Sequence, residues 1–427
     1  MTGTVGNEAL HKQECLSVAI VKRSLGSLKI GFVFGLAVAM LFIGLISVPQ
    51  IVSADAVVGE IDEREPRAAA VNPITNEIYV ISYAGNENFK IIDGVTNQSK
   101  FVAQLSGWPL DVAVNPKTNK IYVTSYLGSI SDQDIVTVID RNNQQTRSIW
   151  TGKNPTAIAV NPVLNKIFVT SREGNSVSII DGETNEVAST VDLGCVPRAI
   201  AVNPQTNKVY ITCSGDVVKI INGETGNLHK SVSVGEYPEA IAIDHAANRV
   251  YIAISGGVSV INGDTDAIKA TIPYNDYFTG ITVNPITHKI YAAGLSSRHV
   301  LIIDGERATI EHTVSVQSKQ KNVVVNSVTN KIYVTTIDGV TVIDGDTNNS
   351  LGTLTVDIGE GDVPLVVNPI TNKIYAGSMN QVKVFVIDGS STDISRIGTG
   401  NNPRSVAINP FTQKAYIANA GSREVTI

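Results

Sequence analysis

The chain has 427 residues, of which 43% are hydrophobic and 17% are charged, and it contains 35 glycines. This composition is typical of a large folded β protein and excludes an intrinsically disordered chain, which carries fewer apolar and more charged residues. The formal net charge of −6 argues against nucleic acid and anionic lipid as partners, because both are bound by basic surfaces.

The N-terminal region contains no repeat and divides into a polar leader, residues 1–29, and a hydrophobic segment. From Ile30 to Val48 the chain has 19 apolar or small residues without a charge. As a helix, this length crosses ~30 Å of hydrocarbon. Basic residues, the last of them Lys29, precede the segment. The positive-inside rule therefore predicts a cytoplasmic leader and an exported domain over residues 55–427.

The hydrophobic segment has three possible interpretations. Val52-Ser53-Ala54 offers the small residues that a signal peptidase reads, which favours a cleaved signal peptide within residues 30–54. The apolar run is longer than a usual signal core, which favours an uncleaved transmembrane anchor. A buried core helix is a third reading, but nothing else in the chain is helical enough to cover it. Without residues 1–54, 29 Lys and Arg remain against 37 Asp and Glu, a net charge of −8.

One motif, Val-Asn-Pro-x-Thr-Asn-Lys-x-Tyr, returns nine times in the exported region at steps of 40 to 46 residues. A period of this length indicates one supersecondary unit, stacked because a single copy cannot bury its own apolar face. The opening residues of the motif are Asn72, Asn115, Asn161, Asn203, Asp244, Asn284, Asn326, Asn368 and Asn409.

Each copy predicts four antiparallel strands. In the third copy, residues 157–160, 166–170, 176–180 and 188–191 alternate or concentrate apolar residues as strands do. Asn161-Pro162 turns the chain after the first strand, because Pro fixes φ and removes an N–H. Asp181-Gly182 predicts a hairpin between the third and fourth strands. Four strands in every ~40 residues predict an all-β fold, a β-propeller with four-stranded antiparallel blades.

The two ends of the repeat region complement each other. Residues 57–62 occupy the place of a fourth strand, whereas the ninth copy supplies three strands, 405–408, 415–418 and 424–427. We therefore expect the N-terminal strand to complete the last sheet and to close a ring of nine blades. A truncated chain, or a ring of eight blades with one spare repeat, is compatible with the same sequence.

One aromatic ring recurs in the second strand of every copy. We expect these rings to pack between neighbouring sheets, because aromatic side chains dominate core burial, although a row of rings is also compatible with a ligand platform. The rings are Tyr79, Tyr122, Phe168, Tyr210, Tyr251, Tyr291, Tyr333, Tyr375 and Tyr416.

The run VNPxTNKIYVTS followed by SVSIIDGETNEV resembles the YVTN β-propeller repeat of archaeal and bacterial surface-layer and secreted proteins. The resemblance covers residues from about 57 to 427. It implies a propeller at the cell surface, usually with about seven blades, so the nine copies depart from the family pattern. The resemblance is weak about function, since other propellers are lactonases, lyases or haem-binding nitrite reductases.

Residues near the start of each first strand are candidates for one mouth of the central channel, where propellers hold their ligands. Five of them are cations and none is His, which is poor equipment for acid–base catalysis. The set suits the binding of an anion or a glycan through Arg forks and a Trp face, and ordinary solvated loop ends are the alternative. The candidates are Arg67, Trp108, Lys153, Arg198, Glu239, Tyr277, Lys321, Asp362 and Arg404.

Two cysteines in the exported region, Cys195 and Cys213, lie 18 residues apart. They can form a disulfide if their Cα atoms approach within ~7 Å, and two separate buried thiols are the alternative. Sequons at Asn97 and Asn348 fall in expected hairpin turns, so both are candidates for glycosylation.

The six histidines have no metal-ligand spacing, so neither a metal nor another cofactor is expected. His245 and His288 replace the Pro and the closing Asn of the motif, and we expect both to be surface substitutions. The sequence predicts an extracellular binding or scaffold propeller, associated with the surface layer or cell envelope, whose partner is a protein or a glycan. The alternative is a propeller enzyme or cofactor binder of the lactonase, lyase or haem class.

Overall fold

The computed structural model describes residues 99–358, apart from 129, 130 and 317, and strand-length pieces between residues 60 and 93 and between residues 365 and 426. The predicted leader and hydrophobic segment lie outside the described residues, and the description below concerns the compact unit Asp55–Ile427. No helix in the described part of this unit is both long and apolar enough to cross a membrane.

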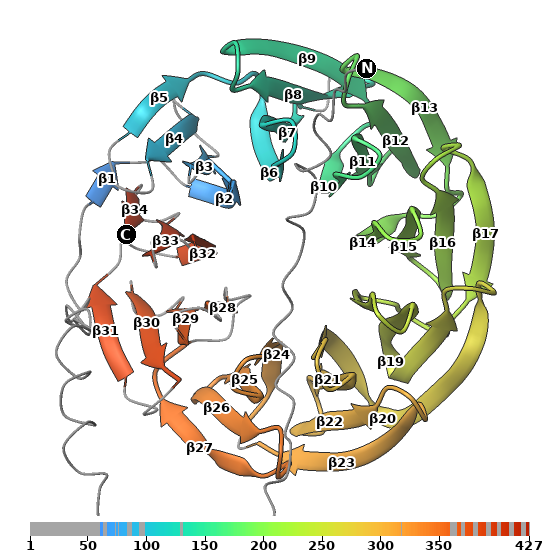
Figure 1. Cartoon of the computed structure of the whole chain (residues 1–427), viewed down its shortest axis with the longest axis vertical. Helices are drawn as coiled ribbons and strands as arrows, with labels where there is room; N and C mark the ends of the chain where they lie inside the picture. The colour runs from blue at the N-terminus through green and yellow to red at the C-terminus, as the bar shows by residue number, and fades with distance from the viewer. Residues whose placement is uncertain are drawn as a thin grey trace, which may run out of the picture. The chain divides into compact units, whose positions relative to one another are not determined.

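The described strands form seven four-stranded sheets and one six-stranded sheet, all antiparallel between sequence neighbours. The sheets follow one another around a ring, each with its first strand innermost (Figure 1). We call each set of four successive strands a blade and name it by its second strand. The six-stranded sheet holds two blades, because β20 (Ala267–Val283) supplies the outer strand of the β19 blade and the inner strand of the β21 blade.

The strands fall into four layers from the centre outward. The other inner strands are β2 (Pro66–Asn72), β6 (Trp108–Asn115), β10 (Pro155–Asn161), β14 (Pro197–Asn203), β18 (Ala240–Asp244), β24 (Gln320–Asn326), β28 (Leu365–Asn368) and β32 (Pro403–Asn409). The second strands are β3 (Glu77–Ser82), β7 (Lys120–Tyr126), β11 (Lys166–Ser171), β15 (Lys208–Cys213), β21 (Lys289–Gly294), β25 (Lys331–Thr336), β29 (Lys373–Ser378) and β33 (Lys414–Asn419), and β19 (Arg249–Asn262) is both second and third.

The third and outer layers complete the blades. The third strands are β4 (Phe89–Asp93), β8 (Asp134–Asp140), β12 (Ser176–Asp181), β16 (Val217–Asn222), β22 (His299–Asp304), β26 (Gly339–Asp344), β30 (Lys383–Asp388) and β34 (Glu424–Thr426). The outer strands are β5 (Ser99–Ala103), β9 (Gln145–Thr151), β13 (Glu186–Asp192), β17 (Leu228–Ser233), β23 (Thr309–Ser315), β27 (Ser350–Thr355), β31 (Ile394–Gly398) and β1 (Glu60–Asp62).

The two ends of the repeat region meet in one sheet. Strand β1 pairs with β34, with Ile61 opposite Val425. Each inner strand contacts the inner strand of the next blade, and β32 contacts β2, so the order of contacts returns to its start. The predicted all-β fold with four-stranded antiparallel sheets is confirmed.

The repeated aromatic rings form the core between sheets. Each of the eight rings whose burial is described, from Tyr79 to Tyr416, is fully buried. Tyr122, for example, packs in one cluster with Val138 of its own blade and Val169 of the next blade. Burial raises the pKa of the Tyr122 hydroxyl well above its usual range. The rings are therefore packing elements, and a ligand platform is wrong for them.

The polar part of the motif joins neighbouring blades through what we call the asparagine ladder. In the β11 blade, Asn161 accepts hydrogen bonds from the backbone of its own turn, at 3.0 Å from the nitrogen of Val163. Its Nδ2 donates to Oδ1 of Asn207, the closing Asn of the next blade, at 3.0 Å. Six described links have this Asn–Asn form. The motif repeats because each of its amides holds two blades together.

The Asp-Gly pair lies in the predicted hairpin between β12 and β13, and the turn extends beyond these two residues. At Asp181 the carboxylate accepts hydrogen bonds from the nitrogens of Glu183 and Thr184, at 2.8 and 2.9 Å, which lowers its pKa. The left-handed residue is Asn185, with φ of 55°. A Cβ on Gly182 would lie 2.6 Å from the backbone oxygen of Asn165. Gly is therefore required by this close approach, and the turn is longer than expected.

Candidate functional site

The inner strands all begin at the same end of the ring, which we call the rim. In four blades the pairing between the first and second strands shifts register, as in a β-bulge, just after the first residue of the inner strand. The bulged positions hold Arg67, Arg198, Lys321 and Arg404. A bulge re-aims a side chain and is common beside functional sites. The sequence placed these residues in loops, and the structure places them inside strands.

The remaining candidates reach the rim in different ways. Trp108 is the first residue of β6, Lys153 precedes β10, and Glu239 directly precedes β18. Tyr277 lies within the long strand β20. Asp362 lies outside the described residues, as does the sequon residue Asn97.

The structure brings three of the predicted residues together. One carboxylate oxygen of Glu239 accepts hydrogen bonds from both the guanidinium of Arg198 and the hydroxyl of Tyr277. We call these residues, from three successive blades, the rim triad. Burial and the Glu239 carboxylate raise the pKa of Tyr277 to about 12, so its hydroxyl stays protonated at neutral pH.

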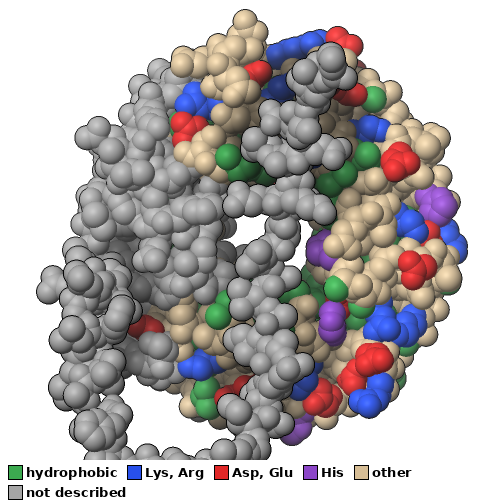
Figure 2. All heavy atoms as spheres, viewed as in Figure 1, with side chains coloured by type: hydrophobic (Ala, Val, Ile, Leu, Met, Phe, Trp, Pro, Cys, Tyr) green, Lys and Arg blue, Asp and Glu red, His purple; other side chains and the backbone are tan. Residues whose placement is uncertain are grey.

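Of the predicted rim cations, the two whose side chains the structure describes are both paired with acids. The charge of Arg198 is balanced by Glu239. The ammonium of Lys153 lies 3.6 Å from a carboxylate oxygen of Glu173. Basic and acidic side chains are interspersed over the described part of the face that Figure 2 shows. Around Glu239 the described groups are a shared carboxylate, a paired guanidinium and a hydroxyl, which suit a ligand that donates and accepts hydrogen bonds.

An exposed aromatic pair lies at the same end of the ring. Trp108 is 43% exposed. Its ring centre lies 5.6 Å from that of Tyr126, which pairs with it across β6 and β7, at an angle of 35°. Trp108 is therefore held by this neighbour while nearly half of its surface is open to solvent, which is the environment of an aromatic side chain that can contact a ligand.

The structure also places the cysteines and the second sequon. Cys195 and Cys213 are joined by a disulfide, with their Cα atoms 5.7 Å apart, next to the start of β14. Asn348 lies in the turn before β27, where Nδ2 donates to Glu311 and Oδ1 accepts from Lys289, each at 3.2 Å. A glycan on Asn348 would compete with the hydrogen bond to Glu311, because it replaces a hydrogen on that nitrogen.

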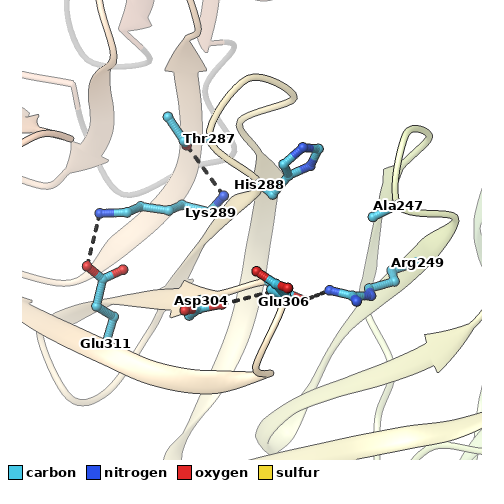
Figure 3. Close-up of a pocket in the computed structure, with 9 residues that line it drawn as sticks. Ala247, Arg249, Thr287, His288, Lys289, Asp304, Glu306 and Glu311 are labelled. Carbon is cyan, nitrogen blue, oxygen red and sulfur yellow. Dashed lines mark hydrogen bonds and ion pairs between the residues drawn. The ribbon is translucent and has the colours of Figure 1, made fainter.

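Sequence reasoning missed a cavity of ≈ 360 Å³ at the opposite end of the ring, where the motif turns lie. It lies between the β19 and β21 blades, with Arg249 on one side and His288 and Glu306 on the other (Figure 3). His288 is not a simple surface substitution, because its Nδ1 lies 2.6 Å from Oδ2 of the buried Asp244. The signal in the sequence was that neighbouring copies depart from the motif at positions that meet.

No family model matches the chain, and no curated protein matches it. Several solved structures have a similar fold. The Dos1 propeller has a TM-score of 0.61 and 14% identity, over 75% of this chain and 92% of that one. Dihydro-heme d1 dehydrogenase NirN in complex with DHE has a TM-score of 0.58 and 14% identity, over 80% of this chain and 78% of that one. Kuenenia stuttgartiensis hydrazine synthase has a TM-score of 0.49 and 22% identity, over 64% of this chain and 94% of that one. At such identities the likeness shows a β-propeller fold and nothing about activity.

Proposed function

We propose that the chain is an exported propeller of the YVTN repeat class, with nine blades, that acts as a binding or scaffold module of the cell surface. The asparagine ladder supports the repeat class, since the residues of the motif are the ones that join blades. Pairing of β1 with β34 supports the blade count. A ring closed in this way leaves no blade incomplete, which suits a rigid platform.

Export rests on two observations. The uncharged segment from Ile30 to Val48 follows basic residues, as in a signal or anchor with a cytoplasmic N-terminus. The disulfide between Cys195 and Cys213 fits the oxidising exterior, because disulfides are rare in reducing compartments. The expected partner is a component of the surface layer or of the surrounding cell envelope.

The observation that carries the proposed binding role is the pairing of an exposed aromatic face with a polar cluster on one rigid rim. Trp108 offers a stacking surface. The rim triad offers a shared carboxylate, a guanidinium and a protonated hydroxyl, all tied to one another. Stacking on an aromatic ring together with neutral hydrogen bonding matches the chemistry of a glycan, so we propose a neutral glycan as the ligand at the rim.

Tryptophan fluorescence tests the proposed glycan site, because the chain has only two Trp residues. Trp150 is 57% exposed on the outer strand β9 of the same blade, three strands out from Trp108, so Trp150→Phe leaves Trp108 as the single reporter. Titration with neutral oligosaccharides from the cell envelope should change its emission. Trp108→Ala, which lacks the reporter and is therefore measured by calorimetric titration, should weaken binding by at least about tenfold, since loss of an aromatic contact costs on the order of 1.4 kcal/mol. Trp150→Ala is the matched control, and equal losses in both variants would sink the proposed site.

Export is tested separately on intact cells. Protease or a membrane-impermeant labelling reagent, added outside, should reach residues in the described blades, whereas a cytoplasmic marker protein stays untouched. A propeller that is labelled only after cell lysis would contradict the proposed location. This outcome is independent of whether a glycan binds at Trp108.

A further inference from the structure

One link of the asparagine ladder is built from different residues. Among the nine copies, only Asp244 opens the motif with an acid, only His288 closes it with a His, and only Arg249 replaces the following Lys or Glu. Asp244 and His288 face each other across two blades, with side chains 1% and 43% exposed. Changes that meet at a single interface, 44 residues apart in sequence, indicate a specialised site rather than scattered surface variation.

The changes also remove a tie that closes other blades. In three blades the closing Asn donates to the residue after the turn Gly, at 2.8 to 3.0 Å: Asn207 to Glu224, Asn248 to Asp264 and Asn330 to Asp346. In the β21 blade the corresponding pair is His288 and Glu306. The imidazole is turned to Asp244, and no hydrogen bond between His288 and Glu306 is found in the described part of the chain. The side-chain tie between the two turns is therefore missing, whereas the backbone nitrogen of Gly305 still donates to the oxygen of His288 at 3.1 Å, and the cavity lies beside these turns.

The walls of the cavity carry complementary groups from two blades. Arg249 donates from one guanidinium nitrogen to the carbonyl oxygen of Gly305, which fixes its position. Glu306 lies in the same cavity, and within the described residues its carboxylate forms no ion pair with Arg249 (Figure 3). Lys289 is paired with Glu311 at 3.1 Å, which balances the charges of that wall. A guanidinium and a carboxylate therefore line one cavity without a described ion pair between them, while the ammonium of Lys269 donates to the backbone oxygen of Glu306 at 2.9 Å.

His288 adds a second acceptor beside Glu306. When Nδ1 carries the proton and donates it to Asp244, Nε2 of the neutral imidazole is an acceptor. A buried carboxylate that fixes the tautomer of a His in this way is common where the other ring nitrogen has a ligand to hold.

We propose that this cavity binds a small zwitterion, a molecule with an ammonium group and a carboxylate. The ammonium group donates to Glu306 and to Nε2 of His288, and the carboxylate accepts from the guanidinium of Arg249, for which paired N–H groups are well suited. The cavity volume of ≈ 360 Å³ is in the range of small-ligand sites. This inference does not depend on the glycan site, which lies at the other end of the ring.

Calorimetric titration of the full chain with glycine, β-alanine and γ-aminobutyrate tests the proposal, since the three probes differ in the spacing of their charges. Acetate and methylammonium are the half-ligand controls. We expect at least one of the three zwitterions to bind ten times more tightly than acetate or methylammonium. Binding of no zwitterion above the halves would overturn the proposal.

Three variants locate the binding. Glu306→Gln removes the carboxylate charge, and Asp244→Asn with His288→Asn restores the ladder pair used elsewhere, so this double variant is expected to fold and to tie the turns. Both should lose binding at least tenfold. Glu224→Gln, at the same turn position in the β15 blade, is the matched control and should bind like the parent. Binding that survives in both cavity variants would overturn the assignment of the site.

Discussion

The two ends of the ring differ in how far their residues vary from one copy to the next. At the ladder end, the same Asn-Pro turn recurs, because each amide bonds its own turn and the next blade. At the rim, the matching positions hold residues as different as Arg198, Glu239 and Lys321. Among the rim side chains that the structure describes, no bond between blades recurs from copy to copy, so these residues are free to differ.

The difference separates stability from binding. A side chain that is repeated in every copy is tied to packing, whereas one that changes at a fixed position is available for recognition. The Asp244–His288 link is an exception at the ladder end, since it departs from the repeat and keeps a bond between blades. Mutations at the two ends should therefore affect different measurable properties.

The largest contrast is expected between two aromatic residues. Tyr122→Ala empties a fully buried position between two sheets and should lower the free energy of unfolding by about 3–5 kcal/mol. Trp108→Ala at the rim should change it by less than about 1 kcal/mol, since Trp108 is half exposed. Urea unfolding followed by circular dichroism measures both. Similar losses for the two variants would break the distinction between the ends.

The exceptional ladder link should show strong coupling. His288→Ala leaves the buried carboxylate of Asp244 without its imidazole partner and should cost about 2 kcal/mol of stability. The double change Asp244→Asn and His288→Asn should recover most of this loss, because six other described links use Asn–Asn. His312→Ala, on the exposed outer strand β23, is the control. Additive effects in the double-mutant cycle would refute the coupling.

Much of the fold could be predicted, because the apolar alternation and the turn residues act locally. The predicted strands 157–160, 166–170, 176–180 and 188–191 lie within β10, β11, β12 and β13. The hairpin at Asp181 was predicted, but the need for Gly182 was not, since it comes from the close approach of an oxygen of Asn165, in a different turn of the same blade. Local turn rules do not contain such a contact.

The candidate site was predicted less completely than the fold. The positions at the rim follow from counting back from each motif, so Arg198, Glu239 and Tyr277 could be named. The convergence of Arg198 and Tyr277 on one carboxylate oxygen of Glu239 could not be predicted, because it depends on the spacing between three blades. The bulges at the starts of the inner strands were missed, since they interrupt the pairing without interrupting the apolar pattern.

A smaller effect is expected at high pH at the rim. Tyr277 should ionise at about pH 12 rather than near 10, because burial and Glu239 both disfavour the phenolate. The folded state then holds its proton more tightly, so this group's contribution to stability is complete below the unfolded pKa and is lost as the pH rises from about 10 towards 12. The absorbance difference between the parent and Tyr277→Phe at 295 nm reports the ionisation. A midpoint near 10 would contradict the buried contact.

The smallest effect is expected at low pH at the ladder end. Backbone N–H groups hold the pKa of Asp181 below its usual value, so its contribution to stability is present above about pH 4 and is lost as the pH falls further. Asp181→Asn keeps the oxygen that accepts these bonds and removes the charge, so it should make unfolding less sensitive to acid. The β15 blade already contains Asn222 at this position, with bonds of 2.9 and 3.0 Å to the same backbone nitrogens. Because that turn keeps its geometry without a charge, the expected difference at neutral pH is only a few tenths of a kcal/mol, and unchanged acid sensitivity would show that the carboxylate is already protonated or unbound.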